Sequence, residues 1–565
     1  MTGAKILMEC LVEQGVDVIF GYPGGTILNV YDALLDYPQI RHILTAHEQG
    51  ACHAADGYAR STGMVGVVMA TSGPGATNLV TGIATAYMDS SPMVCLTCNV
   101  DLSLLGKDAF QEVDITGVTM PITKNNYLVR RVEDLADTLR EAFAIARSGR
   151  PGPVLVDIPK NVTTGTAMFT PLDRRKHGKE GHLGQLMRRA SLNFKPPEPD
   201  HGDIDRLVDM IRQSQKPYVI CGGGVVRSRA DYELDDFVNR IDAPVGLTVM
   251  GAGGFQGLNK LSTGLVGMHG SQASNMAVDA CDLLIAVGCR FSDRVALQPS
   301  TVARNARIVQ IDIDRSEINK NVETAHHIVG DAKRVLELLI ERLEQLDHAP
   351  WKDYVFSFKT QTEYDDARDR MTPGQVLDAI ARTVPRYAIY CTDVGQHQMW
   401  AIQHLHFEYP GQLVTSGGFG AMGFGLGAAI GAQVGNPNDT VVHITGDGSF
   451  RMNCNELATV QYYGLPIITV LFNNGALGMV RQWQTLTLNR RYSQTTLDRG
   501  PDFVKLAEAY GLHARRVNNQ KDLCAAIEDA LACGEGYVID CTLDIDEMVR
   551  PMVSGGDHIS HFLKI

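Results

Sequence analysis

The sequence lacks the features of membrane proteins and of nucleic-acid-binding proteins. No apolar run approaches the roughly 20 residues of a membrane span, and the N-terminus has apolar residues at helical spacing instead of the continuous block of a signal peptide. Lys and Arg number 51 against 64 Asp and Glu, a net charge of −13 without any basic run, which argues against nucleic acid or an anionic membrane as partner. We therefore expect a cytoplasmic protein that binds neither.

The sequence also lacks the cysteine and histidine clusters of disulfide-rich and zinc-binding proteins. Its twelve cysteines are scattered and mostly lie in apolar segments, as Cys281, Cys391 and Cys541 do. This distribution is typical of small core residues in a reducing compartment. Cys95 and Cys98 have a CxxC spacing, but no second pair or neighbouring histidine accompanies them. Neither zinc binding nor a redox role is favoured.

What the chain does have is the length and composition of a multidomain globular protein. At 565 residues, with 44 % hydrophobic and 20 % charged residues, it predicts about three domains of roughly 100–200 residues each. Three regions alternate strand-like and helix-like runs, which predicts an α/β fold of doubly wound parallel-sheet domains. They span residues 1–165, 203–345 and 372–545, joined by a polar, proline-rich linker (166–202) and a charged linker (346–371), and followed by a tail (546–565) that we expect to be a mobile lid.

Two predicted strands in the third region end in polar residues suited to a metal ion. The apolar run 441–445 leads into Gly446, Asp447 and Gly448, and the run 467–472 leads into Asn473 and Asn474. Because parallel strands end at the same edge of a sheet, Asp447 and Asn474 should lie side by side. Carboxylate and amide oxygens suit a Mg²⁺ ion that also binds phosphate, and the flanking glycines let a phosphate approach the backbone. We predict a metal–diphosphate site here.

The middle region carries weaker signals of a dinucleotide-binding domain. Predicted strands at 217–221 and 283–287 run into Gly222–Gly224 and Gly288, and a third strand at 308–313 carries Asp312. The middle region contains no complete G-x-G-x-x-G motif, so these signals favour a Rossmann-like fold without proving it.

Two stretches in the first and third regions resemble each other. Residues 415–422 (TSGGFGAM) echo residues 71–77 (TSGPGAT), and in both places an apolar strand precedes the motif and an Ala/Gly-rich helix follows it. We interpret this as a sign of a duplicated fold whose two copies grip the two ends of one cofactor.

Taken together, these motifs resemble those of the thiamine diphosphate (ThDP) enzymes. Within that group the whole chain is similar to the large, catalytic subunits of acetohydroxyacid (acetolactate) synthases of the biosynthetic, FAD-containing type. The resemblance rests on residues 21–25 (GYPGG), 47–50 (HEQG), 72–79 (SGPGATNL), 108–112 (DAFQE), 267–270 (GMHG), 395–400 (GQHQMW), 446–450 (GDGSF) and 478–484 (GMVRQWQ).

The resemblance implies roles for residues around ThDP. Glu48 corresponds to the glutamate that hydrogen-bonds N1′ of the aminopyrimidine and promotes formation of its imino form, although an exposed acid at a helix N-terminus is the simpler structural interpretation. Gly420 corresponds to the residue whose carbonyl accepts from the 4′-amino group, and Met422 to the wedge that bends the cofactor, although it could be an ordinary core methionine. Further cofactor contacts are implied for Tyr22, Pro23, Gly24, Gly25, Pro74, Asn78, Gln396, His397, Gly446, Gly448 and Ser449, and the implied Mg²⁺ ligands are Asp447, Asn474 and the carbonyl of Ala476.

The resemblance also implies substrate-side and flavin-side residues. Phe110, Gln111 and Lys160 would reach over the cofactor, and Met479, Val480 and Trp483 would form the acceptor pocket, although Met479 and Trp483 are also four apart on one helix face. Arg294 would hold the acceptor carboxylate, with a surface arginine as the alternative. A structural, non-redox FAD is implied for the middle domain, with contacts from Arg150, Gly222, Gly223, Gly224, Met268, His269, Gly288, Arg290, Asp293, Asp312 and Asp331.

The chain departs from the family pattern at two places. Residues 98–101 read Cys-Asn-Val-Asp where the family usually has Gly-Gln-Val-Pro, and Ser292 replaces a common aspartate. Both departures lie near the pocket or the FAD in the family, so they bear on substrate preference and FAD affinity.

The function implied by the resemblance is that of a transferase in isoleucine, valine and leucine biosynthesis. Such an enzyme decarboxylates pyruvate on ThDP and transfers the hydroxyethyl carbanion to pyruvate or 2-oxobutyrate. A pyruvate-oxidase-type flavin oxidoreductase, a ThDP-dependent lyase or C–C hydrolase, and a plain dinucleotide-binding scaffold are the alternatives. A homodimer or homotetramer with the active site between subunits is implied, together with a small regulatory subunit.

Overall fold

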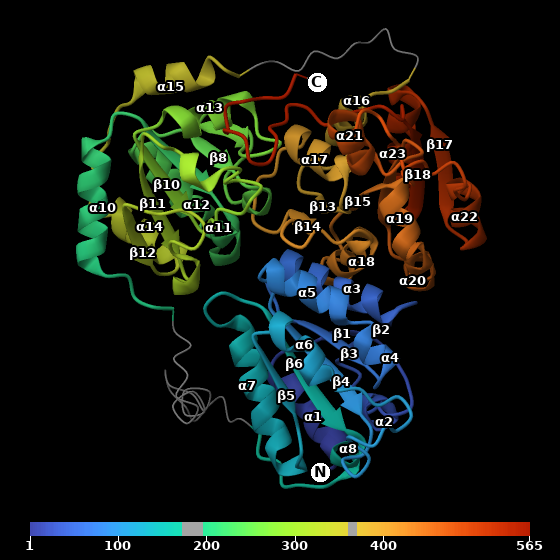
Figure 1. The fold of residues 1–565 in the computed structure, drawn as a ribbon. Helices are drawn as coiled ribbons and strands as arrows, with labels where there is room; N and C mark the ends of the chain where they lie inside the picture. The colour runs from blue at the N-terminus through green and yellow to red at the C-terminus, as the bar shows by residue number, and fades with distance from the viewer. Residues whose placement is uncertain (172–195, 360–369, 565) are drawn as a thin grey trace.

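The computed structural model of the chain describes residues 1–171, 196–359 and 370–564. They form three lobes, each built on a six-stranded sheet flanked by helices (Figure 1). Every strand pairing is parallel, so the predicted α/β fold of three doubly wound parallel-sheet domains is confirmed. Within the described residues no helix is both long enough and apolar enough to cross a membrane.

The N-terminal domain has the strand order β2-β1-β3-β4-β6-β5. Its strands are β1 (Val18–Tyr22), β2 (Arg41–Leu44), β3 (Gly66–Ala70), β4 (Met93–Asn99), β5 (Asn125–Leu128) and β6 (Pro153–Pro159). Its helices are α1 (Gly3–Glu13), α2 (Leu28–Leu34), α3 (Glu48–Thr62), α4 (Pro74–Thr77), α5 (Val80–Met88), α6 (Ile115–Thr119), α7 (Leu135–Arg147) and α8 (Lys160–Thr164).

The C-terminal domain has the order β14-β13-β15-β16-β18-β17, which is the same order once its strands are counted from its own first strand. Its strands are β13 (Ile389–Thr392), β14 (Leu413–Thr415), β15 (Val441–Gly446), β16 (Ile467–Asn473), β17 (His513–Val517) and β18 (Tyr537–Thr542). Its helices are α16 (Pro373–Thr383), α17 (Gln396–His404), α18 (Phe424–Gly435), α19 (Asp447–Asn453), α20 (Leu457–Tyr462), α21 (Gly478–Thr487), α22 (Phe503–Ala509) and α23 (Gln520–Cys533). The two domains are therefore copies of one fold.

The duplication is real, but the sequence echo used to infer it does not join equivalent positions. Residues 71–77 follow β3, the third strand of the N-terminal domain, whereas residues 415–422 follow β14, the second strand of the C-terminal domain. By position in the fold, β14 and α18 correspond to β2 and α3, and β15 corresponds to β3. The echo was misleading because glycine-rich turns are common wherever a strand is followed by a tight turn into a helix near a ligand site.

The middle domain has the order β12-β11-β10-β7-β8-β9, which is the Rossmann order read from its far edge. Its strands are β7 (Pro217–Cys221), β8 (Val245–Leu247), β9 (Ser262–Leu265), β10 (Leu283–Val287), β11 (Arg307–Asp312) and β12 (His326–Val329). Its helices are α10 (His201–Gln213), α11 (Gly223–Ser228), α12 (Asp231–Arg240), α13 (Gln272–Ala280) and α14 (Ala332–Ile340).

The central strands were predictable because both faces of each sheet are covered by helices. Strands β3, β7 and β10 are buried at every residue and coincide with the apolar runs 66–70, 217–221 and 283–287, as expected for parallel sheets buried on both faces. Strand β2 ends at Leu44, because the chain turns soon after it into His47, the N-cap of α3.

Helices α3 and α18 hold the N-terminal and C-terminal domains together (Figure 1). They approach so closely that a Cβ on Gly57 would overlap the backbone of Ala428, and a Cβ on Gly431 would overlap the backbone of Ala54. Glycine at these crossing points therefore allows the two equivalent helices to pack backbone against backbone.

The segments outside the sheets contribute more structure than their composition suggests. Most of the stretch 166–202 lies outside the described residues. Within 346–371, helix α15 (Ala349–Phe356) packs on the middle domain, and Trp351 Nε1 donates to the carbonyl of Pro217 at 2.9 Å. The tail 546–564 is also packed, with Val549, Met552 and Val553 fully buried and Val553 N donating to Met268 O at 2.8 Å. The role of the tail as a mobile lid stays a prediction.

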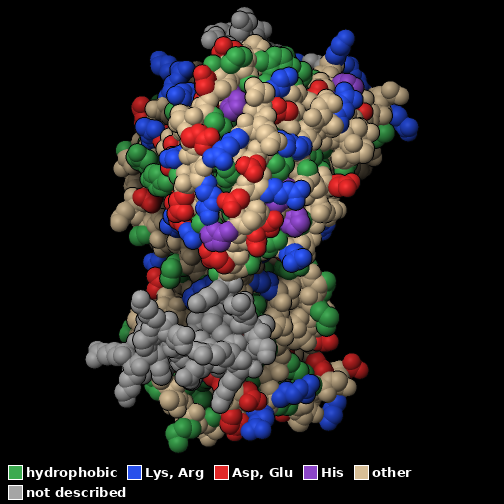
Figure 2. All heavy atoms as spheres, turned by 90° about the vertical axis from the view of Figure 1, so that its left-hand side faces the viewer, with side chains coloured by type: hydrophobic (Ala, Val, Ile, Leu, Met, Phe, Trp, Pro, Cys, Tyr) green, Lys and Arg blue, Asp and Glu red, His purple; other side chains and the backbone are tan. Residues whose placement is uncertain are grey.

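Charge is distributed without a dominant sign on the face shown in Figure 2. Lys and Arg side chains are interspersed there with Asp and Glu side chains over the middle domain. No patch of positive charge of the kind that tracks a nucleic-acid backbone gathers on this face.

Candidate active site

Asp447 and Asn474 meet at the carboxyl edge of the C-terminal sheet. Strands β15 and β16 pair in register up to Gly446 and Phe472, so the next residues of both strands emerge together. Asn473 turns inward, where its Nδ2 donates to Asp540 Oδ1 at 2.9 Å. Asn474 stays at the edge, with Oδ1 accepting from Ala476 N at 3.3 Å. The predicted metal ligands Asp447, Asn474 and Ala476 all line one cavity.

The electrostatics of this edge fit a cation. Asp447 is 3 % exposed, and burial raises its pKa to about 7, so a divalent ion beside it would favour the ionised form. No group of three or more His, Cys, Asp or Glu side chains that could hold a metal ion occurs among the described residues. A metal with this single carboxylate would therefore need phosphate oxygens to complete its shell.

The cavity has a volume of about 1210 Å³ and is formed mainly by the C-terminal and middle domains. That volume exceeds the roughly 300–1,000 Å³ of a typical ligand site, so there is room for more than one group. Its walls contain nearly all of the predicted residues of those two domains, together with Arg150 from the N-terminal domain. The residues of the two domains are Gln396, His397, Gly420, Met422, Gly446, Gly448, Ser449, Met479, Val480, Trp483, Gly223, Gly224, Met268, His269, Gly288, Arg290, Asp293, Arg294, Asp312 and Asp331.

His397 and Gln396 stand at the N-terminus of α17, beside the metal edge. His397 Nε2 is buried without a protein partner, and burial lowers the pKa of His397 to about 4, which keeps the ring neutral. A buried polar atom without a partner at a cavity wall calls for a ligand. The ring is packed so tightly that a Cβ on Gly446 would lie 2.8 Å from His397 Nδ1.

The loop between β14 and α18, residues 416–423, carries Gly420 and Met422. Gly420 has φ +73°, a left-handed conformation in which glycine is unstrained. Met422 is half-buried at the cavity wall. Ser449 opposite donates from Oγ to Val394 O at 2.8 Å, which fixes the first turn of α19 against β13.

The cavity wall with the predicted flavin contacts belongs mainly to the middle domain. Asp312 ends β11, and burial raises its pKa to about 6. Arg150 reaches this wall from the N-terminal domain and donates to Glu317 Oε1 at 2.7 Å. Gly222 is not part of the cavity wall; a Cβ there would overlap Gly288, so it serves the close approach of the β7 and β10 turns.

The residues predicted to contact the acceptor line the same cavity. Met479, Val480 and Trp483 project from α21, and Val480 is half exposed. The Arg294 side chain is 63 % exposed, pairs loosely with Asp293 at 3.7 Å, and lies 3.6 Å from Met268 Sδ. Its guanidinium is free enough to take a carboxylate partner.

None of the predicted residues of the N-terminal domain lines this cavity except Arg150. Glu48 opens α3, and its Oε2 accepts from Asn78 Nδ2 at 2.9 Å. Phe110 is 88 % exposed, and Gln111 beside it has φ +60° and lies against Gly73. The others, Tyr22, Pro23, Gly24, Gly25, Pro74 and Lys160, are exposed or half-buried on the domain surface.

Two residues that the sequence did not single out organise these loops. Glu456 is fully buried and belongs to the C-terminal domain, yet its Oε2 and Oε1 accept from the amides of Ala46 and His47 at 3.1 and 3.0 Å. Gln482 on α21 accepts from Gln396 Nε2 at 2.9 Å and also from Val549 N at 2.9 Å, which ties the metal edge to the tail. A buried carboxylate or amide on a short helix gives no periodic signal, so only the structure reveals them.

The departures from the family pattern are structurally accommodated. Asn99 is buried, and its Nδ2 donates to Asp157 Oδ2 at 2.7 Å and to Val113 O at 3.2 Å. Ser292 lies in the cavity wall, where its carbonyl accepts from the amides of Val295 and Ala296.

Comparison with known proteins places each domain in a family. Residues 1–118, 204–339 and 393–541 match the models of the N-terminal TPP binding domain, the central domain and the C-terminal TPP binding domain of thiamine pyrophosphate enzymes, thiamine pyrophosphate being ThDP. All three described domains are thus accounted for.

Similar proteins match along almost the whole chain. The acetolactate synthase isozyme 2 large subunit of Escherichia coli is 42 % identical over all of both chains. The probable acetolactate synthase large subunit of Methanocaldococcus jannaschii is 43 % identical over 100 % of this chain and 95 % of its own, and the acetolactate synthase large subunit of Corynebacterium glutamicum is 44 % identical over 98 % of this chain and 89 % of its own. The resemblance seen in the motifs is confirmed, and the chain belongs to the acetolactate synthase large-subunit family of thiamine pyrophosphate enzymes.

Proposed function

We propose that the protein is the catalytic subunit of an acetolactate synthase. It joins the two-carbon unit left after decarboxylation of pyruvate to a second pyruvate, giving 2-acetolactate, or to 2-oxobutyrate, giving 2-aceto-2-hydroxybutyrate. The observation that carries the proposal is that one cavity contains both the edge with Asp447 and Asn474 and the wall with Trp483 and Arg294. A diphosphate anchor and an acceptor pocket within one cavity suit a carboligase.

The residues present fit ThDP and Mg²⁺ as cofactors. Asp447, Asn474 and the carbonyl of Ala476 would hold the metal, and the buried, unpartnered Nε2 of His397 suits a diphosphate oxygen or its water. Gln396, Gly446, Gly448 and Ser449 complete this end. When bound, ThDP supplies the nucleophilic carbon and the electron sink for decarboxylation.

Glu48 is proposed to hold a proton at the other end of the cofactor. Its Oε2 already has the amide of Asn78 as partner, so its other oxygen is available for a ring nitrogen. A carboxyl group at that position can exchange a proton with the aminopyrimidine and so control its tautomer. In the same proposal the Gly420 carbonyl accepts from the 4′-amino group and Met422 supports the bend of the cofactor.

The acceptor pocket is proposed to select the second 2-oxoacid. The Arg294 guanidinium would bind its carboxylate, a task suited to the planar fork of arginine. Met479, Val480 and Trp483 would contact its alkyl group. Phe110, Gln111 and Lys160 would close over the reacting atoms and exclude water, which prevents loss of the two-carbon unit as acetaldehyde.

FAD is proposed to bind the middle domain in a structural role. The Rossmann strand order, the close glycine turns at Gly222–Gly224 and Gly288, and Asp312 at the end of β11 support a dinucleotide there. Arg150, Met268, His269, Arg290, Asp293 and Asp331 line the same wall. The proposed reaction has no net redox change, so the flavin would order the wall without turning over.

The active site is proposed to form between subunits of a homodimer or homotetramer. Support comes from the exposure of the N-terminal residues, Phe110 and Tyr22 among them, away from the cavity that contains Asp447. A small regulatory subunit is proposed as a further partner, since the relatives are called large subunits. We also propose a cytoplasmic location, which the twelve free cysteines support.

The test is the product formed from pyruvate with ThDP, Mg²⁺ and FAD, with and without 2-oxobutyrate. Acetolactate alone, and a mixture with 2-aceto-2-hydroxybutyrate when 2-oxobutyrate is added, is the expected outcome. Acetaldehyde or acetate without acetolactate would overturn the proposal. Bleaching of the flavin by pyruvate without air, and peroxide in air, would instead favour the oxidase alternative.

A further inference from the structure

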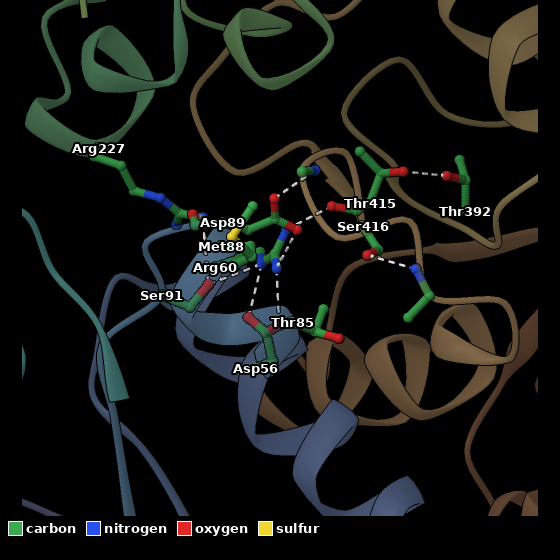
Figure 3. Close-up of polar contacts among 12 residues, drawn as sticks. Asp56, Arg60, Thr85, Met88, Asp89, Ser91, Arg227, Thr392, Thr415 and Ser416 are labelled. Carbon is green, nitrogen blue, oxygen red and sulfur yellow. Dashed lines mark hydrogen bonds and ion pairs between the residues drawn. The ribbon is translucent and has the colours of Figure 1, made fainter. Parts of the chain in front are cut away.

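A cluster of buried charges joins the three domains beside the cavity (Figure 3). At its centre is Arg60 on α3, which is 6 % exposed. Its Nε donates to Asp56 Oδ1 at 2.7 Å and to Ser91 Oγ at 2.9 Å, and its Nη2 donates to Asp56 Oδ2 at 2.8 Å and to Asp89 Oδ2 at 3.1 Å. One guanidinium therefore orients two carboxylates, both of them buried.

Only one of these two carboxylates is bonded to the loop that carries Gly420 and Met422. The second oxygen of Asp89, Oδ1, accepts from Gly418 N at 2.7 Å. The loop comes so close that a Cβ on Gly418 would lie 2.5 Å from this oxygen. In Asp56, by contrast, both carboxylate oxygens accept hydrogen bonds from Arg60. Asp89 thus connects the N-terminal domain to the loop directly.

The loop 416–423 is held at its ends by its own domain. Gln398 Nε2 donates to Thr415 Oγ1 at 2.7 Å, and Ala421 N donates to Ser416 Oγ at 3.0 Å. Arg60 Nη1 adds a bond to Thr415 O at 2.5 Å. Among the hydrogen bonds of the described residues, the one from Gly418 N to Asp89 is the only one made by the backbone of residues 417–420. Because glycine-rich backbone has wide conformational freedom, we expect this bond to restrain the stretch.

Asp89 is itself fixed by the middle domain. Arg227 on α11 donates from Nη2 to Asp89 O at 3.2 Å and to Ser91 Oγ at 3.4 Å. Burial raises the pKa of Asp89, while Arg60 and the Gly418 amide oppose that shift. The ionised form of Asp89 is therefore stabilised by Arg60 and by the Gly418 amide, the two groups that Asp89 connects.

We propose that Asp89 is a positioning residue: by accepting from Gly418 N it orders the loop 416–423 so that Gly420 and Met422 meet ThDP correctly. Asp89 also lines the cavity wall; in this proposal it acts through its hydrogen bond to the loop. The inference rests on the proposed function, because it takes ThDP as the group that the loop contacts.

Asp56 supplies a matched control for this role. It shares Arg60 with Asp89, is equally buried and carries the same charge, yet it makes no hydrogen bond to the loop. Asp56→Ala therefore disturbs the charge cluster to a similar extent while sparing Gly418. Asp89→Asn is a conservative variant, because its amide oxygen can still accept from Gly418 N.

The experiment compares the three variants in the full chain by two measurements. Hydrogen exchange of the apo protein should be faster in peptides covering 416–423 for Asp89→Ala, but not for Asp56→Ala or Asp89→Asn. Titration with ThDP and Mg²⁺ should show an affinity about 10- to 100-fold lower for Asp89→Ala, the range expected when a supporting contact is lost. The affinity of Asp89→Asn should lie closer to the wild type, and melting temperatures separate these effects from general instability.

Either of two results would overturn the proposal: unchanged exchange in 416–423 for Asp89→Ala, or equal losses of protection and affinity for Asp56→Ala. If Asp89→Ala does not fold, Gly418→Ala disrupts the same bond from the loop, because its Cβ would lie 2.5 Å from Asp89 Oδ1. It should raise exchange in 416–423, and unchanged exchange would count against the proposal. Exchange in the apo protein needs neither cofactor nor substrate. A wild-type enzyme that makes no acetolactate would therefore contradict the proposed function without deciding the bond between Asp89 and Gly418.

Discussion

The N-terminal and C-terminal domains are one fold put to two uses. Counted from the first strand of each domain, both sheets run 2-1-3-4-6-5. The loop after the second strand leads to Glu48 in one domain and carries Gly420 in the other. The loop after the third strand leads to Pro74 in one and to Asp447 in the other. In the proposed function, equivalent positions thus carry a proton-holding group in one domain and a backbone carbonyl in the other, or a tight turn in one and a metal ligand in the other.

The two sets of loops differ in their surroundings within one chain. The C-terminal loops face a cavity closed by the middle domain, whereas the N-terminal loops are exposed, with Phe110 88 % accessible and Tyr22 41 % accessible. Exposed apolar side chains around predicted catalytic residues are typical of a surface that binds a partner. In the proposed function, one chain would thus contain both halves of a site, placed where they do not face each other.

The largest expected effect comes from the N-terminal half. Glu48→Ala should lower acetolactate formation by about 10²- to 10⁴-fold, the usual contribution of a general acid–base group, while ThDP affinity stays near the wild type because the diphosphate anchor is untouched. Initial rates and ThDP titration measure the two quantities. Asn78→Ala is the control, because it removes the partner of Glu48 Oε2 but keeps the carboxyl group. A Glu48→Ala enzyme with near-normal rates would remove Glu48 from the mechanism.

A smaller effect is expected from Glu456, through which the C-terminal half holds the N-terminal half. Glu456→Gln places an amide N–H₂ where one oxygen accepts from the amide of Ala46 or His47. An unsatisfied buried group of this kind costs about 1–3 kcal/mol. If the strain falls on the loop before Glu48, turnover should drop roughly tenfold, consistent with that free energy.

The measurement for Glu456→Gln is hydrogen exchange of peptides covering 45–50 alongside turnover. Thr459→Val is the matched control: it removes the hydroxyl that donates to Glu456 Oε2 at 2.6 Å but leaves both backbone bonds in place. Exchange at 45–50 should rise only for Glu456→Gln. The same protection in both variants would show that Glu456 supports its own domain and not Glu48.

Much of the fold could be predicted because parallel strands buried on both faces are continuous apolar runs. Residues 66–70, 217–221 and 283–287 are strands at those limits. The meeting of Asp447 and Asn474 also followed from strand order alone, since both follow strands that had to end at one edge. The predictable part is the part governed by local pattern.

Long-range contacts could not be predicted in this way. Arg60 and Asp89 lie on a helix and a turn of one domain, and their partners Thr415 and Gly418 are more than 300 residues away in the chain. Glu456 has nothing in its neighbourhood that points to His47. The echo between 71–77 and 415–422 was wrongly aligned for the same reason: local composition does not identify which strand of the sheet a turn follows.

The smallest expected departure from the wild-type rate, about fourfold, comes from an experiment that decides whether the two halves of a site come from two chains. Glu48→Ala and Asp447→Ala chains should each be nearly inactive alone. In a hybrid dimer of a symmetric enzyme, one site collects both substitutions and the other collects neither. Random mixing makes about half of the dimers hybrid, so about a quarter of the wild-type rate should return. The measurement is acetolactate formation by the unselected mixture, after the two chains are co-expressed in equal amounts and purified through one tag that both carry.

A matched mixture separates this outcome from simple dilution. Wild-type chains mixed with Glu48→Ala chains should retain about half of the rate whether sites form within or between chains, which calibrates the mixing. If the double-variant mixture stays as inactive as its parents, each site is built within one chain. In that case the N-terminal domain would have to move so that the surface around Phe110 reaches the cavity. This movement would open the contact between α3 and α18, whose backbones touch at Gly57 and Gly431. That contact leaves no room even for a Cβ, and both helices are buried along most of their length. Opening it would expose a large apolar area to water, which is unfavourable. We therefore expect activity to recover in the hybrid.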